Sequence, residues 1–229
     1  AYQLLLEEGG LDAIEKVLAA IDALKEPASL ANKAEIEATY ELYNTTLNDQ
    51  QKAAITNLEK LTGLRTDIEN IEAAIKLIEA LPAAEQVTLS HEKQIDEAQK
   101  AYEALTDALR GEISDANKQK LTSAQARLAD LKAANAVAQK IAAIGTITEA
   151  NWRVQESAAA AARDSYNRLT AAQKALVTNL STLAAAESAI ASMKTESADK
   201  EAAAVIADQI AAIGEITEEN WSQKETQVA

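Results

Sequence analysis

The sequence of 229 residues contains no cysteine and no phenylalanine, and aromatic residues make up only 3% of it. The absence of cysteine excludes disulfides, thiolate metal ligands and cysteine nucleophiles. Six glycines and two prolines leave few positions for the tight turns that a strand-rich fold requires. No run of 18 consecutive apolar residues occurs, so we expect no membrane insertion in this segment.

Hydrophobic residues make up 48% of the chain, which is enough for a packed interior. Alanine, the best helix former, supplies about a fifth of all residues. We therefore expect an all-α fold with a core of alanine, leucine and isoleucine. The net charge of −14 repels phosphates and anionic lipids, so we expect neither nucleic acid nor membrane surfaces as partners.

One phrase of the sequence is repeated. It reads LNDQQKAAITNLEKL at residues 47–61 and LTAAQKALVTNLSTL at 169–183, with a diverged copy, LTDALRGEISDANKQKL, at 105–121. A tyrosine precedes each copy, and an isoleucine anchor lies further upstream. The tyrosines are Tyr43, Tyr102 and Tyr166, and the anchors are Ile21, Ile78, Ile141 and Ile210. This periodicity predicts tandem repeats at 1–68, 69–131 and 132–197, and the start of a truncated fourth at 198–229.

The spacing within the repeats is nearly constant, whereas the spacing between them grows. The distance from the anchor isoleucine to the Asn or Asp of the phrase is 36, 37 and 38 residues, and the distance from there to the next anchor is 21, 26 and 31. The links have the apolar periodicity of helices. We therefore expect an elongated array of small three-helix-bundle-like repeats joined by long shared helices of increasing length.

Helix boundaries are marked by capping residues. Three pairs have the spacing of a capping box, in which two side chains satisfy each other's free backbone donors. The pairs are Asn48–Gln51, Thr56–Glu59 and Thr170–Gln173. Gly145 and Gly214 follow apolar AAI segments, where a left-handed residue ends a helix. These signals predict helices at about 11–24, 30–47, 57–81, 90–106, 115–144, 149–169 and 180–213, with another beginning near 217.

Parts of these repeats have a recognisable family pattern. The segments AYEALTDA (101–108), SYNRLTAAQKALVTNLSTLAAAESAI (165–190) and IAAIGEITEENW (210–221) resemble the helical repeats of large surface and S-layer-associated proteins of Gram-positive bacteria. The resemblance extends from about Leu11 to Ala229. It implies an extracellular, wall-attached setting and a stalk or spacer role, and it brings no catalytic residues with it.

Two tryptophans are the candidate partner-binding residues. Trp152 and Trp221 recur in TITEANW and EITEENW. Each could stack on a sugar or anchor a protein partner. The alternative is structural: with Thr148 as N-cap, Ile147 and Trp152 would form a hydrophobic staple, and Ile216 and Trp221 would repeat it. The repetition favours the staple.

No catalytic, cofactor or metal site is predicted. His91 is the only histidine and has no second histidine or cysteine as a co-ligand, so a structural role is favoured. The three repeat tyrosines are interpreted as core anchors, and the acidic pair Glu218–Glu219 as a solvated surface. No nucleophile, base and orienting group can be assembled, so we expect no enzyme.

The leading functional hypothesis is a non-enzymatic stalk in a larger bacterial cell-surface protein, which projects other domains from the cell wall. The alternative is an adhesin-type helical module that captures a host or neighbouring surface protein. The expected partners are neighbouring domains of the same polypeptide and, for the alternative, another surface or host protein. Neither end has a typical terminal signal, so we expect this sequence to be an excised piece of a longer protein.

Overall fold

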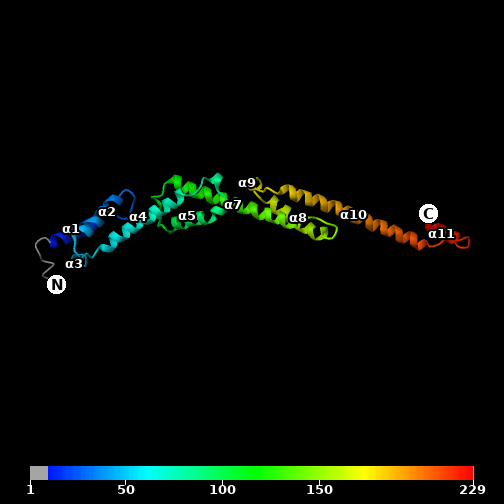
Figure 1. Ribbon diagram of the computed structural model, residues 1–229, viewed down its shortest axis with the longest axis horizontal. Helices are drawn as coiled ribbons and strands as arrows, with labels where there is room; N and C mark the ends of the chain where they lie inside the picture. The colour runs from blue at the N-terminus through cyan, green and yellow to red at the C-terminus, as the bar shows by residue number, and fades with distance from the viewer. Residues whose placement is uncertain (1–9, 229) are drawn as a thin grey trace. The chain divides into compact units, whose positions relative to one another are not determined.

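The computed structural model describes residues 10–228, and these are folded into helices without any strand (Figure 1). The all-α prediction is therefore confirmed. Eight helices of eight or more residues form the framework, and their ends differ from the predicted ends by up to four residues. They are α1 (Gly10–Ala23), α2 (Lys33–Thr46), α4 (Leu58–Glu79), α5 (Glu92–Ala104), α7 (Asp115–Ile144), α8 (Trp152–Asn167), α10 (Leu180–Ile213) and α11 (Trp221–Val228).

Short helices lie between these elements. Three of them are single turns inside the repeated phrase: α3 (Asp49–Lys52), α6 (Asp107–Arg110) and α9 (Ala171–Lys174). Two 3-10 turns, η1 (Ala84–Gln86) and η2 (Leu89–His91), precede α5. The repeated phrase is therefore a short helical turn that joins two longer helices, as its capping signals predict.

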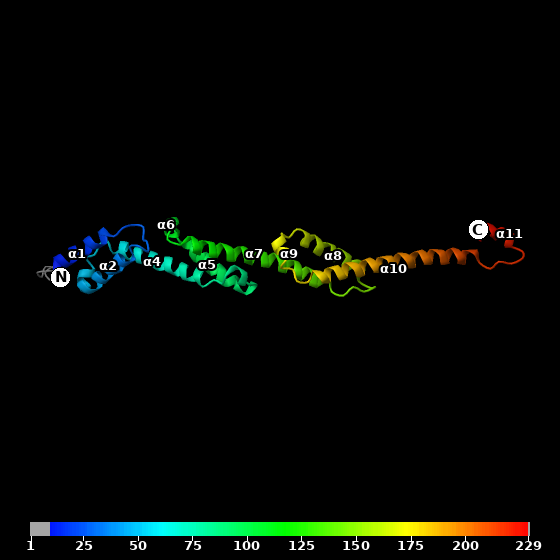
Figure 2. The same ribbon diagram turned by 90° about the horizontal axis from the view of Figure 1, so that it is seen from above.

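The chain divides into two compact units, residues 1–129 and 130–229, and the boundary falls within α7. In the first unit, α4 packs against α1 and α2 and also against α5 (Figure 2). In the second unit, α8 packs against α10. Each unit buries mainly aliphatic side chains, because aromatic residues are scarce.

The buried side of α4 follows the predicted seam with one change. Leu61, Leu64, Ile68, Ile71 and Ile78 are buried in steps of three, four and seven residues. Between the last two, Ala74 is fully buried whereas the predicted Ile75 is only half-buried. At 100° per residue, positions 74 and 75 lie on opposite sides of Ile71, about 60° and 40° away, so helical period alone does not choose between them and the packing of α4 against its neighbours covers Ala74.

The core of the second unit joins the end of α7, α8, the repeated phrase and the first half of α10. Its buried members are Ala134, Val137, Ile141, Ile144, Trp152, Ala159, Ala162, Val177, Leu183, Ala186 and Ile190. Several are alanines, whose small side chains allow helix axes to approach closely. Burial along α10 ends at Ile190, although the helix continues to Ile213.

Two of the three predicted capping boxes are confirmed. Asn48 and Gln51 close the box at α3, and Thr170 and Gln173 close it at α9. In the middle copy, Thr106 caps α6 through the backbone N–H of Leu109 at 3.4 Å. The leucine is buried and has no polar group with which to complete the box.

The third predicted box, Thr56–Glu59, is wrong. The residue before α4 is Asn57, and its side chain makes no capping hydrogen bond. Instead, its amide Nδ2 donates to the carbonyl oxygen of Leu18 at 3.1 Å and to the Asp22 carboxylate at 2.7 Å. A tertiary contact with α1 therefore competes successfully with the local cap for this side chain.

The two predicted glycine stops are confirmed. Gly145 and Gly214 have φ angles of 66° and 64°, in the left-handed region that glycine tolerates. Each follows the last residue of a long helix, Ile144 in α7 and Ile213 in α10.

Candidate functional site

The most regular polar feature of the chain is a contact between a tyrosine and a cation. The last residue of each short helix is basic and lies over the ring of the preceding repeat tyrosine. Lys52 is 5.4 Å from the ring centre of Tyr43, Arg110 is 5.7 Å from that of Tyr102, and Lys174 is 5.7 Å from that of Tyr166. All three rings are half-buried. Such contacts are individually weak, about 0.5–1 kcal/mol at exposed sites, so they orient the phrase against the helix before it.

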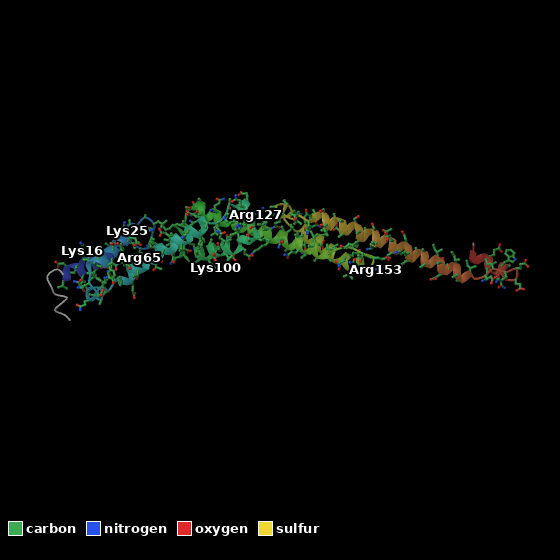
Figure 3. All side chains as sticks on the ribbon, viewed as in Figure 1. Lys16, Lys25, Arg65, Lys100, Arg127 and Arg153 are labelled. Atoms are coloured by element: carbon green, nitrogen blue, oxygen red, sulfur yellow. The ribbon has the colours of Figure 1, made fainter. Side chains whose placement is uncertain are left out.

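Sequence analysis predicted the tyrosines as anchors but missed their cations. A signal was present, because a lysine or arginine stands eight or nine residues after each tyrosine. Arg65 in α4, labelled in Figure 3, makes a closer contact of the same kind, 3.6 Å from the ring centre of Tyr40 in α2. Nothing in the spacing of these two residues identifies that pair, because they come from different helices.

A second repeated contact uses the asparagine of the phrase. Asn179 donates from Nδ2 to the carbonyl oxygen of Ala138 in α7 at 2.9 Å, as Asn57 does to Leu18 in α1. Both accepting carbonyls lie three residues before an anchor isoleucine, Ile141 and Ile21. The middle copy has Asp115 at this position, and a carboxylate cannot donate. There, Lys120 reaches the Glu79 carbonyl oxygen from Nζ at 2.7 Å.

His91 has a structural contact. It ends η2 and accepts at Nδ1 from the backbone N–H of Thr88 at 3.0 Å, which completes a capping box before α5. This arrangement fits the structural role that the sequence favours. No group of three or more His, Cys, Asp or Glu side chains that could hold a metal ion occurs within residues 10–228.

The two tryptophans lie in different environments. Trp152 is 7% exposed and belongs to the core of the second unit, and Ile147 packs against the same core. Trp221 is 54% exposed. The predicted staple geometry is wrong in one respect, because α8 begins at Trp152 with Asn151 before it. The Asn151 Oδ1 accepts from the backbone N–H of Thr148 at 2.8 Å, and this bond holds residues 148–151 in a turn.

A shallow groove of about 380 Å³ runs between α8 and α10. Its central feature is a two-point ion pair: Arg163 donates from Nε and from a terminal nitrogen to Glu187 at 2.8 and 2.5 Å. The Arg163 hydrogen bonds lower the pKa of the Glu187 carboxyl below its usual range, and those to Glu187 raise the pKa of Arg163. Both oxygens of the Glu187 carboxylate accept hydrogen bonds from Arg163. The ion pair therefore links α8 to α10.

Further ion pairs join α10 to α8 and to the turn that precedes α8. Glu156 pairs with Lys194 at 2.7 Å, and Glu149 pairs with Lys200 at 2.5 Å. The hydrogen bond with Lys200 lowers the pKa of Glu149, and the same contact raises that of Lys200. Arg153, labelled in Figure 3, lies 3.5 Å from Glu201 and over the Trp152 ring. These contacts fix the start of α8 on α10.

In the described part of the chain, no helix combines the length and apolar character needed to cross a membrane. Comparison with known proteins identifies no relative: no protein-family model, no curated protein and no solved structure matches the chain.

Proposed function

We propose that the chain is a non-enzymatic structural spacer, built as a linear array of small three-helix-bundle-like repeats joined by shared helices. The repeats are assigned to residues 1–68, 69–131 and 132–197, with the start of another at 198–229. In each, the end of one long helix, a middle helix and the start of the next long helix contribute to one core.

The observation that carries this proposal is the continuity of α7. This helix has 30 residues, about 45 Å at 1.5 Å per residue, and the boundary between the two compact units falls inside it. It has buried residues on both sides of that boundary, Leu121 and Leu128 before it and Val137 and Ile141 after it. We interpret a helix that contributes residues to two cores as the link between them.

The repeated contacts support the same proposal. Three tyrosine–cation contacts and two asparagine–carbonyl contacts recur at matching positions of successive repeats. A catalytic site needs unlike residues gathered at one place, whereas these contacts distribute the same residue types along the chain. These contacts give successive repeats the same local arrangement of helices.

Small-angle X-ray scattering tests the spacer function. A compact protein of this length has a radius of gyration of about 17 Å. We expect a clearly larger value, with a pair-distance distribution that has an extended tail. A radius of gyration near that of a compact globule would contradict the spacer function.

The setting we propose is the surface of a Gram-positive bacterium, in a larger wall-attached protein that projects other domains from the cell. The family resemblance of the repeats supports this setting, and the acidic composition is compatible with a hydrated surface. Brief protease treatment of intact cells that carry the gene tests it. We expect peptides of this chain in the released fraction, without peptides of a cytoplasmic marker protein.

Protein binding is the second candidate function, and the exposed apolar side chains at the end of the second unit favour it. Val205, Ile206, Ile210 and Ile216 are each more than half exposed, as is Trp221. Isolated exposed apolar residues are ordinary, but a group of them on successive turns marks an interaction surface. A capture experiment with purified surface proteins tests this function, with Trp221→Ala expected to weaken capture and leave the helix content unchanged.

A further inference from the structure

The exposed end of the second unit duplicates a segment that is buried elsewhere in the same unit. Residues 210–221 and 141–152 are identical at 10 of 12 positions. Each stretch carries the end of a long helix, a left-handed glycine and the first residue of the following helix. The buried copy contains Ile144 and Trp152, and the exposed copy contains Ile213 and Trp221.

The loops of the two copies are held by the same hydrogen bonds between an asparagine side chain and the backbone. Thr217 donates to Asn220 Oδ1 at 2.7 Å, and Asn220 Nδ2 donates to the Glu215 carbonyl oxygen at 3.1 Å. In the buried copy, Asn151 makes the matching bonds, to the Thr148 N–H at 2.8 Å and to the Thr146 carbonyl oxygen at 3.0 Å. The exposed copy therefore already has its loop in the buried copy's conformation, and a partner that covers it pays little ordering entropy.

The equivalent apolar positions of the two copies differ in what covers them. Val137, Ile141 and Trp152 are between 0 and 7% exposed, because α8 and the first half of α10 pack against them. Their equivalents are more than half exposed. These equivalents are Ile206 (56%), Ile210 (64%) and Trp221 (54%). The segment that covers the buried copy lies in residues 157–193 and presents Ala162, Leu183, Ala186 and Ile190 to it.

The acidic residues that pair with the covering segment are also duplicated. Glu149 and Glu156 pair with Lys200 and Lys194 of α10 at 2.5 and 2.7 Å. The equivalent positions of the exposed copy are again glutamates, Glu218 and Glu225. A partner with the same chemistry as the covering segment would bring two lysines, six residues apart on one helix, to these two glutamates.

Charge indicates which occupant fits. Residues 201–225 contain six acidic and one basic residue, whereas the equivalent buried stretch, 132–156, contains two acidic and three basic residues. Two copies of so acidic a face would repel each other, which disfavours self-association through it. An apolar helical segment without net negative charge is the complementary occupant, and residues 157–200, with five basic and four acidic residues, have this composition.

We propose that the face formed by residues 203–225 is a docking site for a helical hairpin with the chemistry of residues 157–200. The hairpin supplies an alanine- and leucine-rich stripe to Ile206, Ile210 and Trp221, and two lysines to Glu218 and Glu225. This site rests on the second candidate function, protein binding, and it does not require the spacer function.

Tryptophan fluorescence of the full chain, titrated with a synthetic peptide of residues 157–202, tests the docking site. The peptide contains no tryptophan, and Trp152 is already buried, so a shift of the emission to shorter wavelength reports the burial of Trp221. We expect a saturable shift. A peptide of the same composition in scrambled order should give none. Repeating the titration in trimethylamine N-oxide, which favours compact states, controls for a peptide that is unfolded when free.

Matched variants locate the binding. Ile210→Asp should abolish the shift, whereas Val154→Asp, which places the same carboxylate on another exposed apolar residue, should leave it unchanged. The double variant Glu218→Lys/Glu225→Lys should weaken binding about fivefold, the scale of two surface ion pairs. The peptide with Lys194→Glu and Lys200→Glu should recover that loss.

Three results would overturn the proposal. The first is the absence of any shift in buffer and in trimethylamine N-oxide. The second is a shift that persists in Ile210→Asp, which would mean that the peptide exchanges into the covered copy. The third is dimerisation of the chain alone, measured by analytical ultracentrifugation and lost in Ile210→Asp. That result would mean that the occupant of the face is a second copy of the chain. A compact scattering profile would contradict the spacer function without affecting these outcomes.

Discussion

Individual polar residues in this chain act mainly as links between helices. An alanine-rich core brings helices close together but buries little area per residue. The longer polar side chains at the edges cover that core with their methylene stems and pair their charged ends above it. Arg163 and Glu187 do this between α8 and α10, and Arg65 does it between α4 and α2 through the Tyr40 ring.

The Arg163–Glu187 pair should make stability depend on pH. Because the pKa of Glu187 is lowered in the folded protein, its contribution is complete above the ordinary carboxyl value of about 4.3. The contribution is lost as the pH falls through the lower, folded value. Both side chains are about one-third exposed, so solvent screening limits it to about 0.5–1 kcal/mol.

We therefore expect Glu187→Gln to lower the free energy of unfolding at pH 7 by that amount, and to approach wild-type stability at an acidic pH at which the wild-type carboxyl is also protonated. Urea unfolding followed by circular dichroism at both pH values measures the difference. Glu219→Gln, at an exposed position in the same unit, is the control. An equal loss at both pH values would show that the pair is not the cause.

At the scale of single elements, local chemistry sets the boundaries of the helices. Asn48 and Thr170 start short helices through the same reciprocal bonds, and Gly145 and Gly214 end long ones with the same backbone conformation. These devices act within a few residues, and they work independently of what the helix packs against.

The cap at α9 can be tested directly. Thr170→Ala removes the acceptor for the Gln173 backbone N–H and should cost about 1 kcal/mol. Thr182→Ala, the same substitution at an exposed position inside α10, should be neutral or slightly stabilising, because alanine is the better helix former. Thermal unfolding measures both. Equal losses in the two variants would argue against the cap.

Two glycines offer a matched test of backbone conformation. An added Cβ meets no atom within 4 Å at either Gly145 or Gly63, so only the backbone differs between them. Gly145→Ala places alanine at φ 66° and should destabilise by about 1–2 kcal/mol. Gly63→Ala lies inside α4 and should stabilise by about 0.5–1 kcal/mol. Changes of the same sign in chemical denaturation would contradict this explanation.

At the scale of the whole molecule, the proposed spacer function depends on α7. Hydrophobic burial holds each unit together, and the boundary between the two units falls within this helix. Ala129 lies at the boundary and is exposed, so its side chain contributes little to either core.

Ala129→Pro should therefore affect the link more than the units. Proline removes one backbone hydrogen bond and clashes with the preceding turn, at a cost of about 3 kcal/mol. We expect the scattering profile to show a broader set of distances while most of the helical circular dichroism is kept. Ala129→Ser is the control. An unchanged profile would mean that α7 is not the element that sets the spacing.

The sequence predicted the helices well, because their signals are local. The period of the apolar residues placed α4, α7 and α10, and the capping residues located α3 and α9 within the repeated phrase. The failures involve competition between local and distant partners. The Asn57 amide binds α1 instead of capping α4, and α8 begins at Trp152 because the Asn151 side chain holds the preceding residues in a turn.

The tyrosine–cation contacts and the different exposure of the two tryptophans depend on which helices lie side by side. Trp152 and Trp221 stand in nearly identical sequences, yet one is buried and the other is exposed. A local pattern contains the same information for both, so it cannot distinguish them. The binding role predicted for these residues remains a prediction, and the structure favours Trp221 for it.

The amino-acid sequence by itself determined the helical class, most of the helix boundaries and the repeated phrase, because helix propensity, capping and apolar periodicity act over a few residues. Only the tertiary structure decided which apolar faces are covered. Burial depends on segments that are distant in the chain, and the same twelve-residue pattern is covered by α8 and α10 at one place and left open at the other.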